Sequence, residues 1–340
     1  MANAVDNIDT ASLQRYLQAT IPGFGAIESC DKFAGGQSNP TFLVQAAGSK
    51  YVLRRKPPGQ LLKSAHAVDR EYRVMKALEH SAVPVPKMLT LCDDDSVIGS
   101  MFYLMEFVEG RIFWNSTLPE VDATNRRAMY DEMVRLLAAL HTLDLDAANL
   151  RDYGKPGNYF TRQVGRWSDQ YRASQTREQP AMEAVMAWLA AHIPADDGRV
   201  ALIHGDFRFD NVIFHPTEPR VVAVLDWELS TLGHPLSDIA YQCMQLRLPV
   251  DFIIGGLAGV DRAALNIPSE EEYLARYCAL TGIDGIPDWN FYLAFSCFRL
   301  AAILEGVYKR SLDGNASSQK AVQYGAAVEP LARMALDLIG

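Results

Sequence analysis

The chain has 340 residues, 49% of them hydrophobic and 21% charged, which is an ordinary balance for a soluble globular protein. Its length predicts two domains or lobes. A net charge of −9 and an isoelectric point near 5.3 argue against general nucleic-acid binding, and the longest apolar run, near 252–260, is too short to span a membrane.

The first 108 residues are predicted to form a small β-rich lobe with one strong helix. A turn at Gly48-Ser49 joins two short apolar runs into a hairpin. Apolar residues then recur at helical spacing before Pro84 and Pro86, which end the helix. Helices are therefore expected at 12–20 and 64–79, and strands at 41–44, 51–55, 88–92 and 102–107.

From residue 109 onward the pattern is mostly helical, so the second lobe is assigned to 109–340. A short hairpin is expected to interrupt these helices between residues 204 and 228. The chain as a whole is predicted to adopt a bilobal α+β fold. The clearest helices of the second lobe are expected at 128–143, 181–191, 271–280 and 290–308.

The second lobe contains the motif HGDFRFDN at 204–211, followed after an apolar strand at 220–225 by LDWE, which ends at Glu228. A histidine–aspartate motif alone is often only a turn or a cap, but the full spacing is more specific. Phosphoryl transfer requires a group that orients the attacking hydroxyl and hard oxygen ligands for Mg²⁺ on the nucleotide. Asp206 is placed to accept the hydroxyl proton, and Asn211 and Asp226 to bind Mg²⁺. This pattern predicts a small-molecule kinase that uses ATP and Mg²⁺.

Two upstream segments fit the nucleotide side of such a site. The turn that contains Gly35, Gly36 and Ser38 would bring backbone N–H groups close to a phosphate chain. An ordinary hairpin is the alternative interpretation of this turn. At the end of the strand 102–107, the Glu106 carbonyl and the Val108 N–H would bind an adenine edge, although a plain core strand has the same pattern.

The strand at 51–55 carries a candidate phosphate-binding cation. Alternation along the strand puts Val52, Arg54 and Lys56 on one face. A cation there would bridge the phosphates, and Glu71 on the following helix is its natural carboxylate partner. A solvated strand edge is the alternative.

These motifs resemble the aminoglycoside phosphotransferase/choline kinase branch of the protein-kinase-like fold, over nearly the whole chain. More narrowly, YVLRRKPPG at 51–59 and GHP at 233–235 resemble a subgroup that comprises free-standing bacterial phosphotransferases and kinase-like domains fused to some acyl-CoA dehydrogenases. The resemblance implies transfer of the γ-phosphoryl group of ATP to the hydroxyl of a 4-hydroxyacyl thioester or acid. It rests on Gly35-Gly36, the strand 52–54, Glu71, the segment 105–108, HGDFRFDN, LDWE and GHPLSD at 233–238.

The resemblance also implies roles for individual side chains. The family's phosphate-binding position is usually lysine, whereas strand alignment puts Arg54 there, with Lys56 as the other candidate. Arg208 lies where related kinases carry a lysine that steadies the γ-phosphate, and a local salt bridge is its alternative role. Asp238 would brace the catalytic segment or cap the following helix. Glu228 is left open as a metal, water or substrate ligand.

Basic residues between 151 and 177 bear on the acceptor. Six arginine and lysine residues oppose two aspartates there, namely Arg151, Lys155, Arg162, Arg166, Arg172 and Arg177 against Asp152 and Asp169. A basic surface suits a carboxylate or the phosphates of coenzyme A. An anionic hydroxy compound is therefore the expected acceptor, with an aminoglycoside or other amino-alcohol as the alternative. A solvated helix face would explain the same cluster without a ligand.

Two other classes of function stay open. A metal-dependent phosphohydrolase could use His204, Asp206 and Asp226 as ligands, but it would leave Glu71 and the glycine turn unexplained. A non-catalytic nucleotide-binding pseudokinase is disfavoured by the intact Asp206, Asn211 and Asp226 set.

The cysteines and the first residues bear on location. Five scattered cysteines without a CxxC or CxxH pair indicate reduced thiols. The first residues lack the basic and apolar regions of a signal peptide. A cytoplasmic enzyme without a nucleic-acid or membrane partner is expected. The use of GTP in place of ATP and a homodimeric state are both left open.

Overall fold

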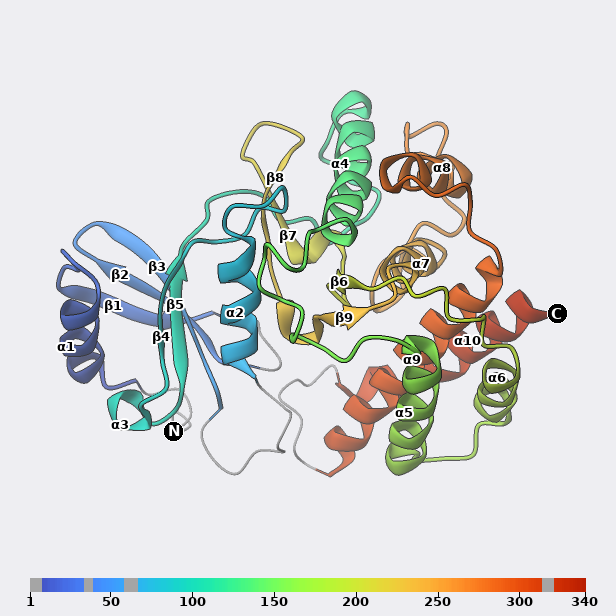
Figure 1. Cartoon of the computed structure of the whole chain (residues 1–340), viewed down its shortest axis with the longest axis horizontal. Helices are drawn as coiled ribbons and strands as arrows, with labels where there is room; N and C mark the ends of the chain where they lie inside the picture. The colour runs from blue at the N-terminus through green and yellow to red at the C-terminus, as the bar shows by residue number, and fades with distance from the viewer. Residues whose placement is uncertain (1–7, 34–38, 58–66, 314–320) are drawn as a thin grey trace. The chain divides into compact units, whose positions relative to one another are not determined.

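The computed structural model describes residues 8–33, 39–57, 67–313 and 321–340. The chain divides into two compact units. The first contains residues 1–111, 212–216 and 221–229, and the second contains residues 112–211, 217–220 and 230–340. The first is built on an antiparallel sheet and the second is mostly helical, which confirms the α+β class (Figure 1). The segments 212–216 and 221–229, which the sequence analysis assigns to the second lobe, belong with the first unit.

A five-stranded sheet forms the centre of the first unit. Its order is β1-β2-β3-β5-β4, and every pairing is antiparallel. The core beneath it gathers apolar side chains such as Phe42, Leu53 and Leu104. The strands are β1 (Ile27–Lys32), β2 (Thr41–Ala46), β3 (Ser49–Arg55), β4 (Met88–Cys92) and β5 (Phe102–Glu106).

The predicted turn at Gly48 is confirmed as the connection between β2 and β3. Ala46 pairs with Ser49, so the loop has two residues, Ala47 and Gly48. Both have positive φ, 49° and 75°, as a two-residue hairpin turn with the twist of its strands requires. Side chains along β2 alternate between half-buried and buried, which fixes the register of the hairpin.

Helices α1 (Thr10–Thr20), α2 (Val68–Leu78) and α3 (Asp95–Ile98) accompany this sheet. The Asp9 side chain caps α1 by accepting the Ser12 amide at 3.0 Å. The predicted start of α2 at Ser64 lies outside the described residues, and the helix is described from Val68. Its buried face includes Glu71, a carboxylate among apolar neighbours.

A second hairpin belongs to the first unit and carries the LDWE motif. Strands β7 (Val212–Phe214) and β8 (Val221–Val224) pair antiparallel, and the short helix η3 (Trp227–Leu229) follows. The Phe214 carbonyl and amide both bond to Arg111, and the Val224 amide bonds to the Pro84 carbonyl, each at 2.8 Å. These backbone bonds join β7 and β8 to the amino-terminal part of the unit.

The second unit is a helical body with one small strand pair. β6 (Ala201–Ile203) pairs antiparallel with β9 (Thr231–Gly233), so the residues just before the HGDFRFDN motif lie beside those that follow LDWE. The helices are α4 (Ala123–His141), α5 (Tyr159–Ser174), α6 (Pro180–Ala191), α7 (Leu236–Leu246), α8 (Glu270–Thr281), α9 (Trp289–Leu312) and α10 (Ala321–Ile339), with the short η2 (Phe209–Asn211).

Helix α9 is long and apolar enough to cross a membrane by composition and length alone. However, 83% of its apolar window is buried inside the protein, where it packs against α5, α6, α7 and α10. That is the environment of a core helix. Figure 1 shows α9 in the middle of the helices of this unit.

Candidate active site

The catalytic segment 204–211 is held by a carboxylate from α7. The amides of His204 and Gly205 donate to Asp238 Oδ2 and Oδ1 at 2.6 and 2.9 Å. Gly205 has φ of 86°, a conformation that disfavours any side chain. Helix α7 begins at Leu236 after the N-cap residue Pro235, so Asp238 lies inside its first turn and the alternative prediction of an N-cap at Asp238 is wrong. Its carboxylate instead fulfils the predicted bracing role.

A buried chain of hydrogen bonds supports Asp238 in turn. His141 Nε2 lies 3.4 Å from Asp238 Oδ2, and its Nδ1 lies 2.7 Å from the Tyr277 hydroxyl. Burial would raise the pKa of Asp238, but the hydrogen bond and charge of His141 and the backbone donors outweigh it and lower the pKa. His141 is thus a hydrogen-bonded core histidine, as its place on an apolar helix predicts.

The Asp206 carboxylate contacts three side chains of the second unit. The Tyr241 hydroxyl donates to Oδ1 at 2.7 Å, and Arg208 Nε lies 3.1 Å from the same oxygen. Asn211 Nδ2 donates to Oδ2 at 3.0 Å and to the Asp206 carbonyl at 2.8 Å. The Tyr241 hydroxyl donates to Oδ1 and the Arg208 guanidinium forms an ion pair with it, whereas Oδ2 accepts one amide, so Oδ2 has more capacity to accept a proton.

Arg208 is tied to the segment that carries it. Besides Asp206 it pairs with Asp210 Oδ2 at 3.1 Å, and its side chain is 15% exposed. The local salt bridge considered as its alternative role is therefore present. The fork of the guanidinium connects two carboxylates of one short loop, which fixes the orientation of Asp206.

In the first unit, Arg54 is surrounded by carboxylates. Its Nε lies 3.0 Å from Glu71 Oε2, which confirms the predicted pair between the strand and the helix. Its Nη2 lies 3.1 Å from Asp226 Oδ1 and 3.3 Å from Glu228 Oε2. Burial would lower the pKa of Arg54, but these negative charges, Glu71 foremost, raise it above its ordinary value. Lys56, the other candidate cation, is half-buried and lies one residue beyond the end of β3.

Glu71 is held from three directions. Besides Arg54, Asn39 Nδ2 donates to Oε1 at 2.8 Å and the Tyr103 hydroxyl donates to Oε2 at 3.0 Å. Its side chain is 2% exposed. A buried carboxylate with this many partners fixes the position of the Arg54 guanidinium on the sheet.

Asn211 and Asp226 each offer one oxygen that suits Mg²⁺. The amide nitrogen of Asn211 is used for Asp206, so its oxygen points away and accepts no hydrogen bond within the described residues. One Asp226 oxygen contacts Arg54, and the other is open to a cation. Asp226 has φ of 62°, a conformation rare outside glycine that tends to mark functional positions. Amide and carboxylate oxygens are the ligands Mg²⁺ prefers, so the donor chemistry fits.

The phosphohydrolase alternative fits less well. His204 is fully buried and its Nδ1 accepts the Asp206 amide at 3.2 Å, which removes that nitrogen as a metal ligand. Among the described residues, no group of three histidine, cysteine or acidic side chains is arranged to hold a metal ion. Both observations count against a hydrolase of that kind.

The structure describes only some of the remaining candidates for nucleotide binding. Gly35, Gly36 and Ser38 lie outside the described residues. Val52 is 8% exposed on β3, where it pairs with Leu43 and Met105. Glu106 is the last residue of β5, and in the described part of the chain the Val108 N–H two residues later has no hydrogen-bond acceptor. That amide is therefore able to bind a ligand.

Residues 29–294 match the family model described as the phosphotransferase enzyme family. The chain belongs to this family. The predicted resemblance to aminoglycoside phosphotransferases is thereby confirmed, and the family supports the prediction of a phosphotransferase with an alcohol group as acceptor.

Curated relatives are longer than this chain. Acyl-CoA dehydrogenase family member 10 of Mus musculus is 49% identical over 96% of this chain but only 31% of its own length. Acyl-CoA dehydrogenase family member 11 of Gallus gallus is 48% identical over 97% of this chain and 43% of its own length. The chain therefore spans less than half of these relatives.

Solved structures extend the likeness. One from Ralstonia eutropha JMP134, named provisionally as an aminoglycoside phosphotransferase, is 50% identical, covers 98% of both chains and has a TM-score of 0.88. A mutant of aminoglycoside phosphotransferase APH(4)-Ia with AMP-PNP and hygromycin B is 17% identical, covers 97% of this chain and 99% of its own, and has a TM-score of 0.61. The second match shows a shared fold only.

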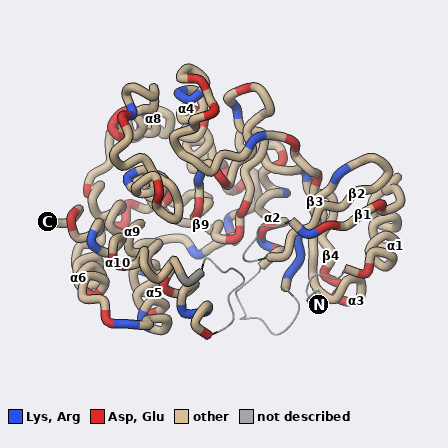
Figure 2. The backbone as a smooth tube through the Cα atoms, turned by 180° about the vertical axis from the view of Figure 1, so that it is seen from behind, with Lys and Arg blue, Asp and Glu red and all other residues tan. Residues whose placement is uncertain are grey.

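Several arginines of the basic stretch 151–177 are already engaged in ion pairs or hydrogen bonds within the protein. Arg151 pairs with Asp146, and Arg172 pairs with Glu183, both carboxylates just outside the counted stretch. Arg162 and Arg177 bond to main-chain carbonyls. Figure 2 shows acidic and basic positions interspersed around α5. Two of the four excess positive charges are therefore neutralised locally, by carboxylates that a linear count of the stretch omits.

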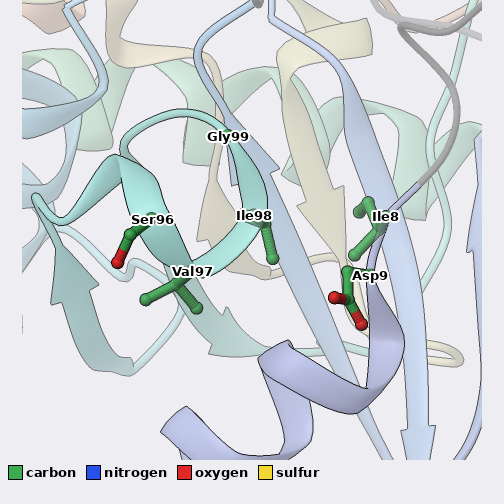
Figure 3. Close-up of a pocket in the computed structure, with 6 residues that line it drawn as sticks. All are labelled: Ile8, Asp9, Ser96, Val97, Ile98 and Gly99. Carbon is green, nitrogen blue, oxygen red and sulfur yellow. The ribbon is translucent and has the colours of Figure 1, made fainter.

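A surface pocket of the first unit is separate from the candidate residues. Its only carboxylate, Asp9, is already used in the cap of α1 (Figure 3). None of the predicted site residues takes part in it. It is lined by Ile8, Asp9, Ser96, Val97, Ile98 and Gly99.

Two side chains of the second unit escaped the sequence analysis. Tyr241, which holds Asp206, lies on a helix of buried residues where a tyrosine has no special pattern. Arg299 is the only charged residue between Trp289 and Leu304. A lone charge in an apolar helix is expensive to bury, and that signal could have identified it.

Proposed function

We propose that this protein transfers the γ-phosphoryl group of ATP to the hydroxyl of an anionic hydroxy compound, such as a 4-hydroxyacyl-CoA or the free hydroxy acid. The observation that carries the proposal is the Asp206 carboxylate, fixed by Tyr241, Arg208 and Asn211 with one oxygen less occupied than the other. A base that is already oriented needs no rearrangement when the acceptor arrives.

Asp206 Oδ2 accepts the proton of the acceptor hydroxyl in this scheme. The acceptor oxygen forms a bond to the γ-phosphorus, and the bond between that phosphorus and the β,γ-bridging oxygen breaks. ADP leaves with the electron pair of the broken bond. The contacts of Arg208 with Asp206 and Asp210 place its positive charge next to the base, where it would also stabilise the charge on the transferred group.

The first unit supplies the nucleotide contacts. Arg54, oriented by Glu71, would contact the phosphates, and the Val108 N–H and Glu106 carbonyl would bind the adenine edge. The turn with Gly35, Gly36 and Ser38 would cover the phosphates, with Val52 against the base. These assignments follow the family pattern and are part of the proposal.

Asn211 and Asp226 would hold Mg²⁺ through their amide and carboxylate oxygens. When bound, the ion would neutralise charge on the β- and γ-phosphates. Asp226 shares the Arg54 guanidinium with Glu71 and Glu228, so three carboxylates gather within 3.3 Å of one guanidinium and outnumber it. That excess supports the binding of a cation.

The acceptor class rests on the relatives. Those that match over nearly the whole chain are named acyl-CoA dehydrogenase family members, and the matched part is a minor share of each. A kinase segment joined to an acyl-CoA dehydrogenase suggests a shared acyl thioester substrate. The structure from Ralstonia eutropha supports a second candidate, phosphorylation of an aminoglycoside or other amino-alcohol.

ADP release with ATP and Mg²⁺ tests the proposal. We expect release that depends on 4-hydroxyacyl-CoA or the free 4-hydroxy acid and that kanamycin does not support. ADP release with kanamycin alone would replace the anionic acceptor by the second candidate. Phosphate release without any acceptor would contradict the kinase assignment itself.

A further inference from the structure

Arg299 is a buried cation that has no carboxylate partner in the part of the chain that the structure describes. It lies within α9 and is 6% exposed. Within the described residues its guanidinium makes no hydrogen bond and no ion pair, and its contacts are with two aromatic rings. A buried charge normally requires a partner, because desolvation is not otherwise compensated.

The two rings place Arg299 next to the catalytic base. Its guanidinium carbon lies 5.7 Å from the ring centre of Tyr241 and 5.7 Å from that of Trp167. Tyr241 is the residue whose hydroxyl donates to Asp206 Oδ1 at 2.7 Å. One tyrosine therefore contacts Asp206 with its hydroxyl and Arg299 with its ring face.

A second polar group near Arg299 also has no partner. Trp167 Nε1 is buried and makes no hydrogen bond within the part of the chain that the structure describes. A buried N–H without an acceptor is destabilising, so such groups commonly mark a missing ligand or water. Arg166 stacks on the same indole at 5.7 Å and is exposed, which adds positive charge at this position.

The positive charges act on neighbouring phenols. Burial is the main reason that the pKa of Tyr159 is raised, and the charges of Arg299 and Arg166 partly oppose it. Burial and the charge of Asp206 likewise raise the pKa of Tyr241, and the charges of Arg208 and Arg299 partly oppose this rise. These arginines therefore give Tyr159 and Tyr241 positively charged surroundings, which favour an anion.

We propose that Arg299, with the Trp167 indole N–H, binds a negatively charged oxygen group of the acceptor and so positions its hydroxyl at Asp206. This inference rests on the proposed function, and it specifies which residues recognise the acceptor. The group bound is a carboxylate in the free hydroxy acid or a phosphate in the coenzyme A thioester. Arginine suits both, because its planar fork can donate two parallel hydrogen bonds.

The same geometry disfavours a polycationic acceptor. An aminoglycoside would bring ammonium groups toward an unpaired guanidinium, and like charges in a buried site repel strongly. The Arg299 subsite therefore separates the two acceptor classes on physical grounds. It also predicts that an acceptor without any anionic group binds weakly.

Kinetics of Arg299→Gln test the proposal, with the free 4-hydroxy acid and its coenzyme A thioester as separate acceptors. Loss of a charge-assisted pair is expected to raise KM for the recognised acceptor by about 10- to 100-fold, with a smaller change in kcat. KM for ATP is expected to stay the same. Arg299→Lys keeps the charge and is expected to recover part of the loss. Arg276→Gln, an exposed change of equal charge on α8, is the control.

Binding without turnover gives a second readout. Acceptor titrated calorimetrically into the protein without nucleotide is expected to bind to wild type and Arg276→Gln and not to Arg299→Gln. The acceptor that loses affinity identifies the source of the anion, acid or thioester. Thermal unfolding of Arg299→Met is expected to match wild type, since the substitution removes an unpaired charge.

The outcomes separate this inference from the proposed function. Wild-type activity with an anionic acceptor, together with unchanged KM in Arg299→Gln, would overturn the subsite and leave the function intact. If Arg299→Met unfolds at a much lower temperature, Arg299 serves packing and the subsite is also rejected. Wild type that phosphorylates neither anionic acceptor overturns the proposed acceptor class first.

Discussion

Arg54 in the first unit and Arg299 in the second are both largely buried arginines, but the groups around them differ in charge. Arg54 faces three carboxylates within 3.3 Å, from Glu71, Asp226 and Glu228. Arg299 faces two aromatic rings and no carboxylate in the described chain. Excess negative charge attracts a metal cation, and an uncompensated positive charge attracts an anion. Each imbalance thus indicates the charge of its own ligand.

The largest expected effect comes from replacing Asp206, the proposed catalytic base. Asp206→Asn keeps the hydrogen-bonding shape but removes the base, so kcat is expected to fall about 10²- to 10⁴-fold. ATP binding is expected to persist, because the proposed contacts with the adenine and the phosphates belong to the first unit, whereas Asp206 belongs to the second. Steady-state kinetics and nucleotide titration measure both, and wild-type turnover would remove Asp206 from the mechanism.

Removing the Arg54 guanidinium is expected to lower the stability of the first unit. Arg54→Met leaves Glu71 buried without its cation, and breaking such a pair is expected to cost about 3–5 kcal/mol of unfolding free energy. Urea unfolding measures the loss. Lys56→Met is the matched control, one residue beyond the end of β3, and is expected to change stability little. Equal effects of the two substitutions would contradict the assignment of Arg54 as the buried partner.

Tyr241→Phe tests the link between the two candidate features of the second unit. It removes one hydrogen bond to Asp206 and keeps the ring that contacts Arg299. Because hydrogen bonds to charged groups are worth about 1.5–3 kcal/mol, kcat is expected to fall about 10- to 100-fold with little change in either KM.

A double-mutant cycle identifies the route of this effect. In the Asp206→Asn background, Tyr241→Phe is expected to cause little further loss, since the tyrosine acts through the carboxylate. Additive losses would show that Tyr241 acts in some other way.

The smallest effect concerns the brace of the catalytic segment and its pH dependence. Asp238→Asn weakens one of two backbone hydrogen bonds and is expected to lower stability by about 1–3 kcal/mol at pH 7. The folded pKa of Asp238 lies below its ordinary value of 3.8, so this stability is present above that pH and is lost as pH falls through the folded pKa. Urea unfolding should therefore show the gap between wild type and variant shrinking below about pH 4. A gap independent of pH would contradict the role of the charge.

Local patterns were sufficient for much of the fold and part of the site. The β2–β3 hairpin, the strand Met88–Cys92 and the Arg54–Glu71 pair follow from alternation, helical spacing and neighbouring elements. Strand β1 is not among the expected strands, because its side chains do not alternate between apolar and polar. Its pairing with β2 supplies what its own pattern lacks.

The proposed acceptor subsite could not be predicted from local sequence patterns, for a physical reason. Trp167, Tyr241 and Arg299 come from α5, α7 and α9, and only tertiary packing brings them together. The basic stretch 151–177 led to an overestimate of the positive charge at this surface, because Asp146 and Glu183 neutralise two of its arginines. Charge counts along a sequence omit the partners that folding provides.

Phosphorus NMR of the reaction products would test the central claim most directly. Wild type is incubated with ATP, Mg²⁺ and a 4-hydroxyacyl-CoA, and Asp206→Asn is run in parallel. We predict a phosphate ester on the acceptor hydroxyl together with ADP for wild type, and neither product at the wild-type rate for the variant. Inorganic phosphate in place of the ester, or an ester formed equally well by the variant, would contradict an Asp206-dependent kinase of anionic hydroxy compounds.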